Sequence, residues 1–188
     1  GRKYKQVIIN QNNLEKVGEV IGLFAGDGNY YHDVKKGDRR IRFYFNAKED
    51  ILIEYYRRSI KLVTQKLSRL YHSGTFKVLE IKSKVFIEFI KDYLFWETNK
   101  TFSVRLRKED FLQKRLFAKG FIRGLVDSDG YVRRGRKEIY FGSTSKNLFG
   151  NFLFGLGMII FTGKRCTTFT QFPLAFSGGN NEKLRSPL

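Results

Sequence analysis

The chain has 188 residues, and its 41% hydrophobic content, with 19 phenylalanines and 10 tyrosines, provides for a packed core and excludes a disordered chain. Its 36 lysines and arginines against 18 acids give a net charge of +18, which in a folded domain favours a polyanionic partner. One cysteine excludes an internal disulfide and a cysteine-rich zinc site, two histidines are too few for a histidine-based metal centre, and no apolar run is long enough to span a membrane.

Residues 1–13 are basic and polar, and we interpret them as an N-terminal arm that either follows a phosphate backbone or frays. No secretory signal peptide is visible at the start of the sequence. An intracellular protein that is not secreted is therefore expected.

The segment 14–28, LEKVGEVIGLFAGDG, returns 102 residues later as 116–130, LFAKGFIRGLVDSDG. Small residues recur four apart in both copies: Gly18, Gly22 and Gly26 in the first, and Gly120, Gly124 and Ser128 in the second. This spacing predicts two helices, each with a small-residue stripe. A glycine inside a helix costs about 1 kcal/mol relative to alanine, so a stripe is expected where two backbones approach closely. We predict that the helices pack stripe to stripe and bring Asp27 and Asp129 side by side.

The ends of the two repeated helices carry the most unusual chemistry. Gly28 and Gly130 are interpreted as left-handed residues that close the helices, which would leave Asp27 and Asp129 at the C-termini. The helix dipole and mutual repulsion both disfavour two carboxylates there, and a divalent cation between them would relieve both effects. Oxygen ligands suit Mg²⁺ or Ca²⁺. The alternative is that the repeat records only a duplication whose acids cap helices.

A β-hairpin is predicted over residues 29–46, with its turn at residues 35–38. Along its second strand two sets of side chains alternate: Ile41, Phe43 and Phe45 on one face, and Arg40, Arg42, Tyr44 and Asn46 on the other. This period of two predicts one buried face and one exposed face with cationic and hydrogen-bonding groups.

The rest of the first repeat, which spans residues 14–97, is predicted to continue with a helix, a hairpin and a helix. The helix over 48–68 is amphipathic, and its apolar anchors are Ile51, Leu52, Tyr55, Ile60, Val63 and Leu67. The hairpin covers 69–83 with its turn at residues 73–74, and the last helix covers 84–97. Residues 98–107 then form a basic connection to the second repeat.

The second repeat, residues 108–188, is predicted to follow the same order. After the helix over 116–130 come a hairpin over 131–144 and a helix from 146 to about 161 that Gly163 closes. Two short strands follow in 164–177, and the tail is too short for the closing helix of the first repeat. The prediction is a mixed α/β (α+β) fold of two αββαββ(α) halves.

The segments VIGLFAGDG (20–28) and IRGLVDSDG (122–130) resemble the motif of the LAGLIDADG homing endonucleases, in the monomeric type with two motifs. The resemblance implies pseudo-symmetric halves, a helix–helix interface and a saddle of antiparallel sheets that binds double-stranded DNA. It also implies that the penultimate acid of each motif, Asp27 and Asp129, binds the catalytic metals, with Gly26 and Ser128 beside them as further candidate ligands. Asp127, at the position where the first copy has Ala25, is not assigned a catalytic role.

A two-stranded β-ribbon fits the major groove of B-DNA, where arginine can pair with guanine. The candidates for base reading are Arg40, Arg42, Tyr44, Asn46, Tyr140 and Thr144. The candidates for phosphate contacts near the hairpin tips are Lys35, Lys36, Arg39, Arg133, Arg134 and Arg136. For any single cation, a solvated surface charge is the competing interpretation.

The resemblance implies hydrolysis of both strands of a long pseudo-palindromic or asymmetric site. Mg²⁺ is the expected cofactor, with Mn²⁺ substituting for it and Ca²⁺ supporting binding without cleavage. Lys48 and Lys146, at matching places after each hairpin, are candidate catalytic residues that stabilise charge at the phosphate, or else ordinary lysines of a first helical turn. The alternatives are a maturase that binds intron RNA and a non-catalytic DNA-binding transcription factor on the same scaffold.

Overall fold

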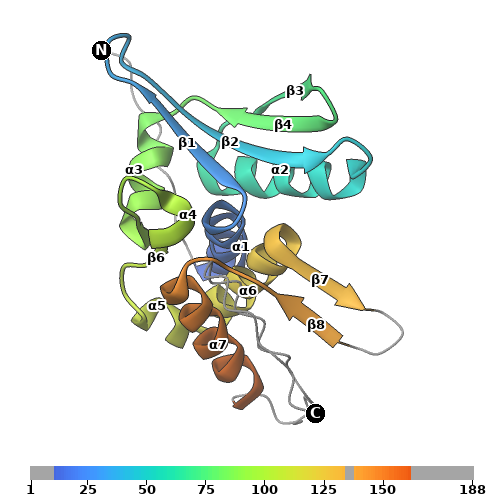
Figure 1. The fold of residues 1–188 in the computed structure, drawn as a ribbon, viewed down its shortest axis with the longest axis vertical. Helices are drawn as coiled ribbons and strands as arrows, with labels where there is room; N and C mark the ends of the chain where they lie inside the picture. The colour runs from blue at the N-terminus through green and yellow to red at the C-terminus, as the bar shows by residue number, and fades with distance from the viewer. Residues whose placement is uncertain (1–10, 134–137, 162–188) are drawn as a thin grey trace, which may run out of the picture.

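The computed structural model describes residues 11–133 and 138–161 (Figure 1). After a short 3₁₀ turn, η1, the first half has the predicted order of helix, two strands, helix, two strands and helix. Its elements are η1 (Gln11–Asn13), α1 (Leu14–Ala25), β1 (Gly28–Asp33), β2 (Asp38–Asn46), α2 (Asp50–Thr64), β3 (Arg69–Ser73), β4 (Phe76–Ile81) and α3 (Lys84–Tyr93).

The four strands of the first half form one antiparallel sheet in the order β1-β2-β4-β3. The predicted alternation in β2 is confirmed, because Ile41, Phe43 and Phe45 are buried in the core while the side chains between them lie on the opposite face. Both hairpins turn where predicted. Gly37 and Gly74 adopt a φ of 61° there, a conformation that costs glycine no steric strain.

The predicted anchors of α2 are only partly right. The helix buries Ile53, Tyr56, Ile60 and Val63, and Leu52 and Tyr55 pack against the core as partly buried residues. Ile51 is 90% exposed and Leu67 is 69% exposed, so both assignments are wrong. The buried stripe lies on the side of α2 that packs against the sheet and α1. The helix ends before Leu67, because Gln65 adopts a left-handed φ of 54°.

The connection between the halves is folded rather than extended. It contains α4 (Lys100–Ser103) and β6 (Arg105–Leu106), and β6 pairs with β5 (Leu94–Phe95), so α3 is shorter than predicted. α5 (Asp110–Gln113) follows. The connection is bonded to the second half, because Ser145 Oγ donates to the carbonyl of Val104 at 2.6 Å and the Leu106 amide donates to Asn151 Oδ1 at 2.9 Å.

The second half repeats the order of the first with α6 (Arg115–Asp129), β7 (Gly130–Arg133), β8 (Glu138–Phe141) and α7 (Lys146–Phe161). The strand register supports the predicted equivalence of the two repeats, since Gly130 pairs with Phe141 as Gly28 pairs with Phe43. Gly163, the strands predicted over 164–177 and the arm up to residue 10 lie outside the described residues. No helix in the described ranges is both long and apolar enough to cross a membrane.

α1 and α6 pack against each other at the centre of the molecule, with the four-stranded sheet on one side and β7–β8 on the other (Figure 1). A Cβ added to Gly22 would lie 2.2 Å from the carbonyl oxygen of Phe121, and one added to Gly124 would lie 2.2 Å from that of Glu19. Only glycine permits this approach. The predicted stripe-to-stripe packing is confirmed, and it brings the two helix ends together.

Candidate active site

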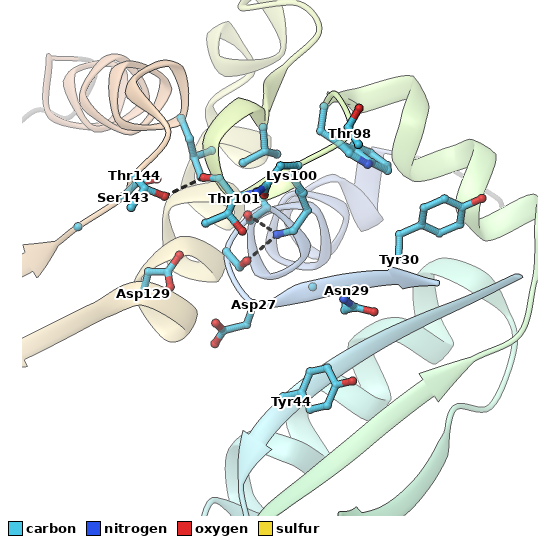
Figure 2. Close-up of a pocket in the computed structure, with 18 residues that line it drawn as sticks. Asp27, Asn29, Tyr30, Tyr44, Thr98, Lys100, Thr101, Asp129, Ser143 and Thr144 are labelled. Carbon is cyan, nitrogen blue, oxygen red and sulfur yellow. Dashed lines mark hydrogen bonds between the residues drawn. The ribbon is translucent and has the colours of Figure 1, made fainter. Parts of the chain in front are cut away.

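A cavity of about 1020 Å³ opens where α1 and α6 end, and residues of both halves and of the connection line it. Asp27 and Asp129 point into this opening from the neighbouring ends of the two motif helices (Figure 2). Asp129 Oδ2 lies so close to α1 that a Cβ on Gly26 would be 2.8 Å from it. The structure therefore places both predicted acids in one site.

The glycines at the helix ends do not have the predicted conformation. Gly28 is the first residue of β1 and Gly130 is extended, with φ −104° and ψ 166°, so neither is left-handed. Glycine is required there for close approach: a Cβ would lie 2.4 Å from the Phe24 ring at Gly28 and 2.5 Å from the Val126 carbonyl oxygen at Gly130. Each strand leaves the site by folding back tightly over the last helical turn.

Lys100 from α4 supplies what a left-handed glycine would have supplied at the end of α1. Its Nζ donates to the carbonyl oxygens of Ala25 and Gly26 at 2.8 and 2.6 Å (Figure 2) and to that of Phe24 at 2.9 Å. The ammonium satisfies otherwise unpaired carbonyls and sits at the negative end of the helix dipole. In the sequence Lys100 stands out only as one basic residue of the connection. The helix cap Asn99 before it signals α4, but no local pattern indicates that the lysine reaches α1.

The acids and the lysine perturb one another. Partial burial, followed by repulsion from Asp129, raises the pKa of Asp27 to about 6, against the opposing effect of Lys100. Burial also raises the pKa of Asp129, while Lys100 lowers it. Burial lowers the pKa of Lys100 to about 8, although both acids favour its charged form. At neutral pH two carboxylates share one ammonium, which leaves an excess of negative charge that attracts a cation.

The donor set fits a hydrated hard cation. Asp27 and Asp129 offer carboxylate oxygens, and in the described ranges no cluster of three or more histidine, cysteine or acidic side chains is present. Mg²⁺ commonly binds through one or two carboxylates and completes its shell with water and phosphate oxygens. The carbonyl of Gly26 already accepts from Lys100, and Ser128 Oγ donates to carbonyls of its own helix, so both are weaker candidates than the acids.

The two lysines proposed as catalytic do not line the cavity that holds the acids. In the described part of the chain, neither Lys48 nor Lys146 is among its wall residues. Lys48 instead lines a second cavity beside Tyr55 and Arg123, and Lys146 is the first residue of α7. Their catalytic assignment stays a prediction.

Hydroxyl groups line the cavity on the side of the second half. Thr101, Ser143 and Thr144 contribute to the wall, and Thr144 Oγ1 donates to the carbonyl of Thr101 at 2.8 Å (Figure 2). Asp127, which was not assigned a catalytic role, accepts a hydrogen bond from the Tyr56 hydroxyl at 2.7 Å and does not line this cavity. The sequence had proposed Thr144 for base reading, but it lies beyond the end of β8.

The base-reading candidates of the first half share one sheet face. Arg40, Arg42, Tyr44 and Asn46 project from the face of β2 opposite the core, and Lys35 and Lys36 are exposed at the hairpin turn. Of the second-half candidates, Tyr140 lies in β8 against Tyr131, and Arg133 ends β7. Arg134 and Arg136 lie outside the described residues.

Arg39, the remaining first-half candidate, forms an exposed pair with Glu88 at 3.5 Å and donates to His32 Nε2 at 3.2 Å. Arg39 lies beside the hairpin turn, where a phosphate contact was predicted. That contact stays a prediction.

Known proteins share this fold. The family model of the LAGLIDADG-like domain matches residues 117–154. The fold is similar to mesophilic variants of the homing endonuclease I-DmoI, with a TM-score of 0.60, 15% identity, and coverage of 78% of this chain and 74% of that one. It is also similar to the homing endonuclease I-WcaI bound to its DNA recognition sequence, with a TM-score of 0.50, 13% identity, and coverage of 85% and 71%.

The family model therefore matches the second half of the chain, and the solved structures share its fold. The chain carries two similar motif segments, 20–28 and 122–130, in one polypeptide.

One curated relative is much longer than this chain. The glutamine–fructose-6-phosphate aminotransferase of Methanocaldococcus jannaschii is 29% identical over 129 residues, which are 68% of this chain and 11% of that protein. The chain thus spans about a tenth of the length of that relative, and the likeness concerns one segment of it.

Proposed function

We propose that the protein is a site-specific, metal-dependent DNA endonuclease that makes a double-strand break within a long duplex site. One observation carries the proposal: two acids, one from each motif copy, converge in a single cavity between two halves that present sheet faces. A non-catalytic DNA-binding protein would gain nothing from paired acids whose burial and mutual repulsion raise the pKa of Asp27 to about 6.

Asp27 and Asp129 would hold Mg²⁺, which when bound polarises the scissile phosphates and stabilises the attacking and leaving oxygens. Solved structures of I-DmoI with DNA include one with Mg, one with Mn and one with Ca. These structures support Mg²⁺ or Mn²⁺ as the cofactor here, and Ca²⁺ as an ion that allows binding.

The chain's own residues supply orientation and charge. Lys100 holds the end of α1 and keeps a positive charge within the cavity, where phosphate charge would accumulate. The polar face of β2 would enter the major groove, and the cations at the hairpin tip would contact phosphates and set the register. Because both motifs lie in one chain with unequal halves, we propose a monomer on an asymmetric or pseudo-palindromic site. A genomic DNA target also implies an intracellular location.

The test is a cleavage selection from a randomised duplex DNA library with Mg²⁺, with Ca²⁺ as the binding control. We expect the wild type to cut a discrete long site, and Asp27→Asn or Asp129→Asn to bind that site without making the double-strand break. Asp92→Asn is the matched control, because it removes the same charge from an exposed position on α3.

The other outcomes separate the alternatives. Tight, sequence-specific binding without cleavage by any divalent ion would identify a transcription factor or other binding module. Preference for folded intron RNA over the duplex library would identify a maturase.

A further inference from the structure

A nearly buried carboxylate lies within the surface that the proposed function assigns to DNA. Glu80 on β4 is 8% exposed and stands opposite Arg42 of β2 in the strand register. A negative charge is unfavourable in a surface that approaches phosphates, and burial of an unpaired carboxylate costs several kcal/mol. Glu80 must therefore be held by specific partners.

Arg42 is the main partner of Glu80. Its Nε donates to Glu80 Oε2 at 2.8 Å, and its guanidinium lies 5.4 Å from the ring centre of Tyr31. These contacts restrict the arginine to one orientation. Guanidinium has five N–H donors, so with Nε occupied its terminal nitrogens Nη1 and Nη2 still have hydrogens to donate.

Arg40, two residues earlier on the same face, is bound differently. Its Nε donates to Asp38 Oδ2 at 2.6 Å, its Nη2 pairs with the same oxygen, and its Nη1 lies 3.4 Å from both oxygens of Glu80. All three nitrogens are thus directed at carboxylates. Lys82 reinforces Asp38 from the other side at 2.6 Å. Arg40 is part of the scaffold that fixes Glu80, and each of its three nitrogens already has a carboxylate partner.

Resting on the proposed function, we propose that Glu80 is a positioning residue that aims Arg42 at a guanine of the target, so that Arg42 and not Arg40 reads that base pair. A guanine presents two acceptors, O6 and N7, to the major groove, and an arginine oriented in advance can donate to both. Because Glu80 and Tyr31 already restrict the side chain, less conformational entropy is lost on binding. The carboxylate contributes to sequence selection although it touches no DNA.

The experiment compares the site preferences of variants in a binding selection from a randomised duplex DNA library with Ca²⁺. The wild type should select a guanine at one position that Glu80→Gln and Arg42→Lys both relax, each with a loss of about tenfold in discrimination against other bases. Glu88→Gln is the matched control, because Glu88 pairs with Arg39 at 3.5 Å on the surface and its loss changes the net charge equally. It should leave every base preference unchanged.

If Glu80→Gln impairs folding, Arg42→Lys and Arg40→Lys still test the proposal. The proposal requires that Arg42→Lys relaxes a single position and that Arg40→Lys, which acts only through Glu80, relaxes no other position. It is overturned by a Glu80→Gln protein that folds and retains the wild-type preference, by an equal weakening of all positions, or by relaxation with Arg40→Lys alone.

Failure of the nuclease proposal gives a different result. A wild type that selects a discrete site but never cuts it with Mg²⁺ refutes the endonuclease and leaves the Glu80 comparison readable. A wild type that selects no sequence refutes both proposals.

Discussion

The two motif helices are copies of each other along most of their length and differ at their ends. α1 stops at Ala25, so that Asp27 lies two residues beyond the helix, whereas α6 continues through Asp129 itself. The carbonyls at the end of α1 accept from Lys100, while α6 closes with the Gly130 amide on Val126 and the Ser128 hydroxyl on its own helix. A duplicated motif therefore produces two unequal halves of one site, because only one end receives the lysine of the connection.

The largest expected effect is on the cleavage of the two DNA strands. Asp27→Asn and Asp129→Asn should each slow cleavage of one strand by about 1,000-fold, since each removes a carboxylate that holds the metal at one phosphate. A supercoiled plasmid that carries the selected site should then accumulate as a nicked circle, and end-labelling should identify different surviving strands in the two variants. If both variants leave the same strand intact, the acids do not divide the work between the strands.

The helix interface is the part in which the two copies should behave alike. Gly22→Ala and Gly124→Ala should each lower the free energy of unfolding by about 3 kcal/mol, because each methyl group would collide with backbone of the other helix. Urea denaturation gives the measurement. Gly150→Ala, inside α7, is the control, since a Cβ there would meet nothing within 4 Å. This substitution should stabilise the protein by up to about 1 kcal/mol.

Lys100→Met tests the element that only one end has. The variant should lose cleavage by about 100-fold, because it removes an ammonium beside the two acids, and it should also melt at a lower temperature because three carbonyls lose their donor. Cleavage rates at the selected site and thermal melting give the two readouts. Lys61→Met, on the exposed face of α2, should leave both unchanged, and cleavage at the wild-type rate by Lys100→Met would limit the lysine to a structural role.

The smallest expected effect is a stability change with pH that runs opposite to that of an ordinary ion-paired carboxylate. The pKa of Asp27 is raised from 3.8 to about 6, so its ionised form opposes folding at neutral pH and this cost disappears as the pH falls from 7 toward 4. Solvent screening at this exposed side chain reduces the cost to about 1 kcal/mol.

Thermal melting between pH 4 and 8 in a chelator provides the check. Asp27→Asn should be more stable than the wild type at pH 7 and equal to it near pH 4, and Mg²⁺ should raise the melting temperature of the wild type. A wild type whose stability relative to Asp27→Asn is constant over this range would mean that the carboxyl is not perturbed.

Much of this protein was determined by patterns within short stretches of sequence. The four-residue spacing of glycines predicts that α1 and α6 meet, because no other residue lets two backbones come so close, and this places Asp27 and Asp129 together. The alternation in β2 and the glycine turns at Gly37 and Gly74 follow from equally local rules. The repeat itself, offset by 102 residues, predicts the order of the halves.

Only the tertiary structure decided how the ends of these elements are completed. Lys100 reaches carbonyls of a helix some 75 residues earlier, and Glu80 meets Arg42 across a strand register, so neither pairing has a signature in adjacent residues. The same limit explains the errors at Ile51, which lies on the solvent side of α2, and at Gly28, whose role is close approach to Phe24. Periodicity determines which residues share a face, whereas the partner that each face meets depends on packing of the whole chain.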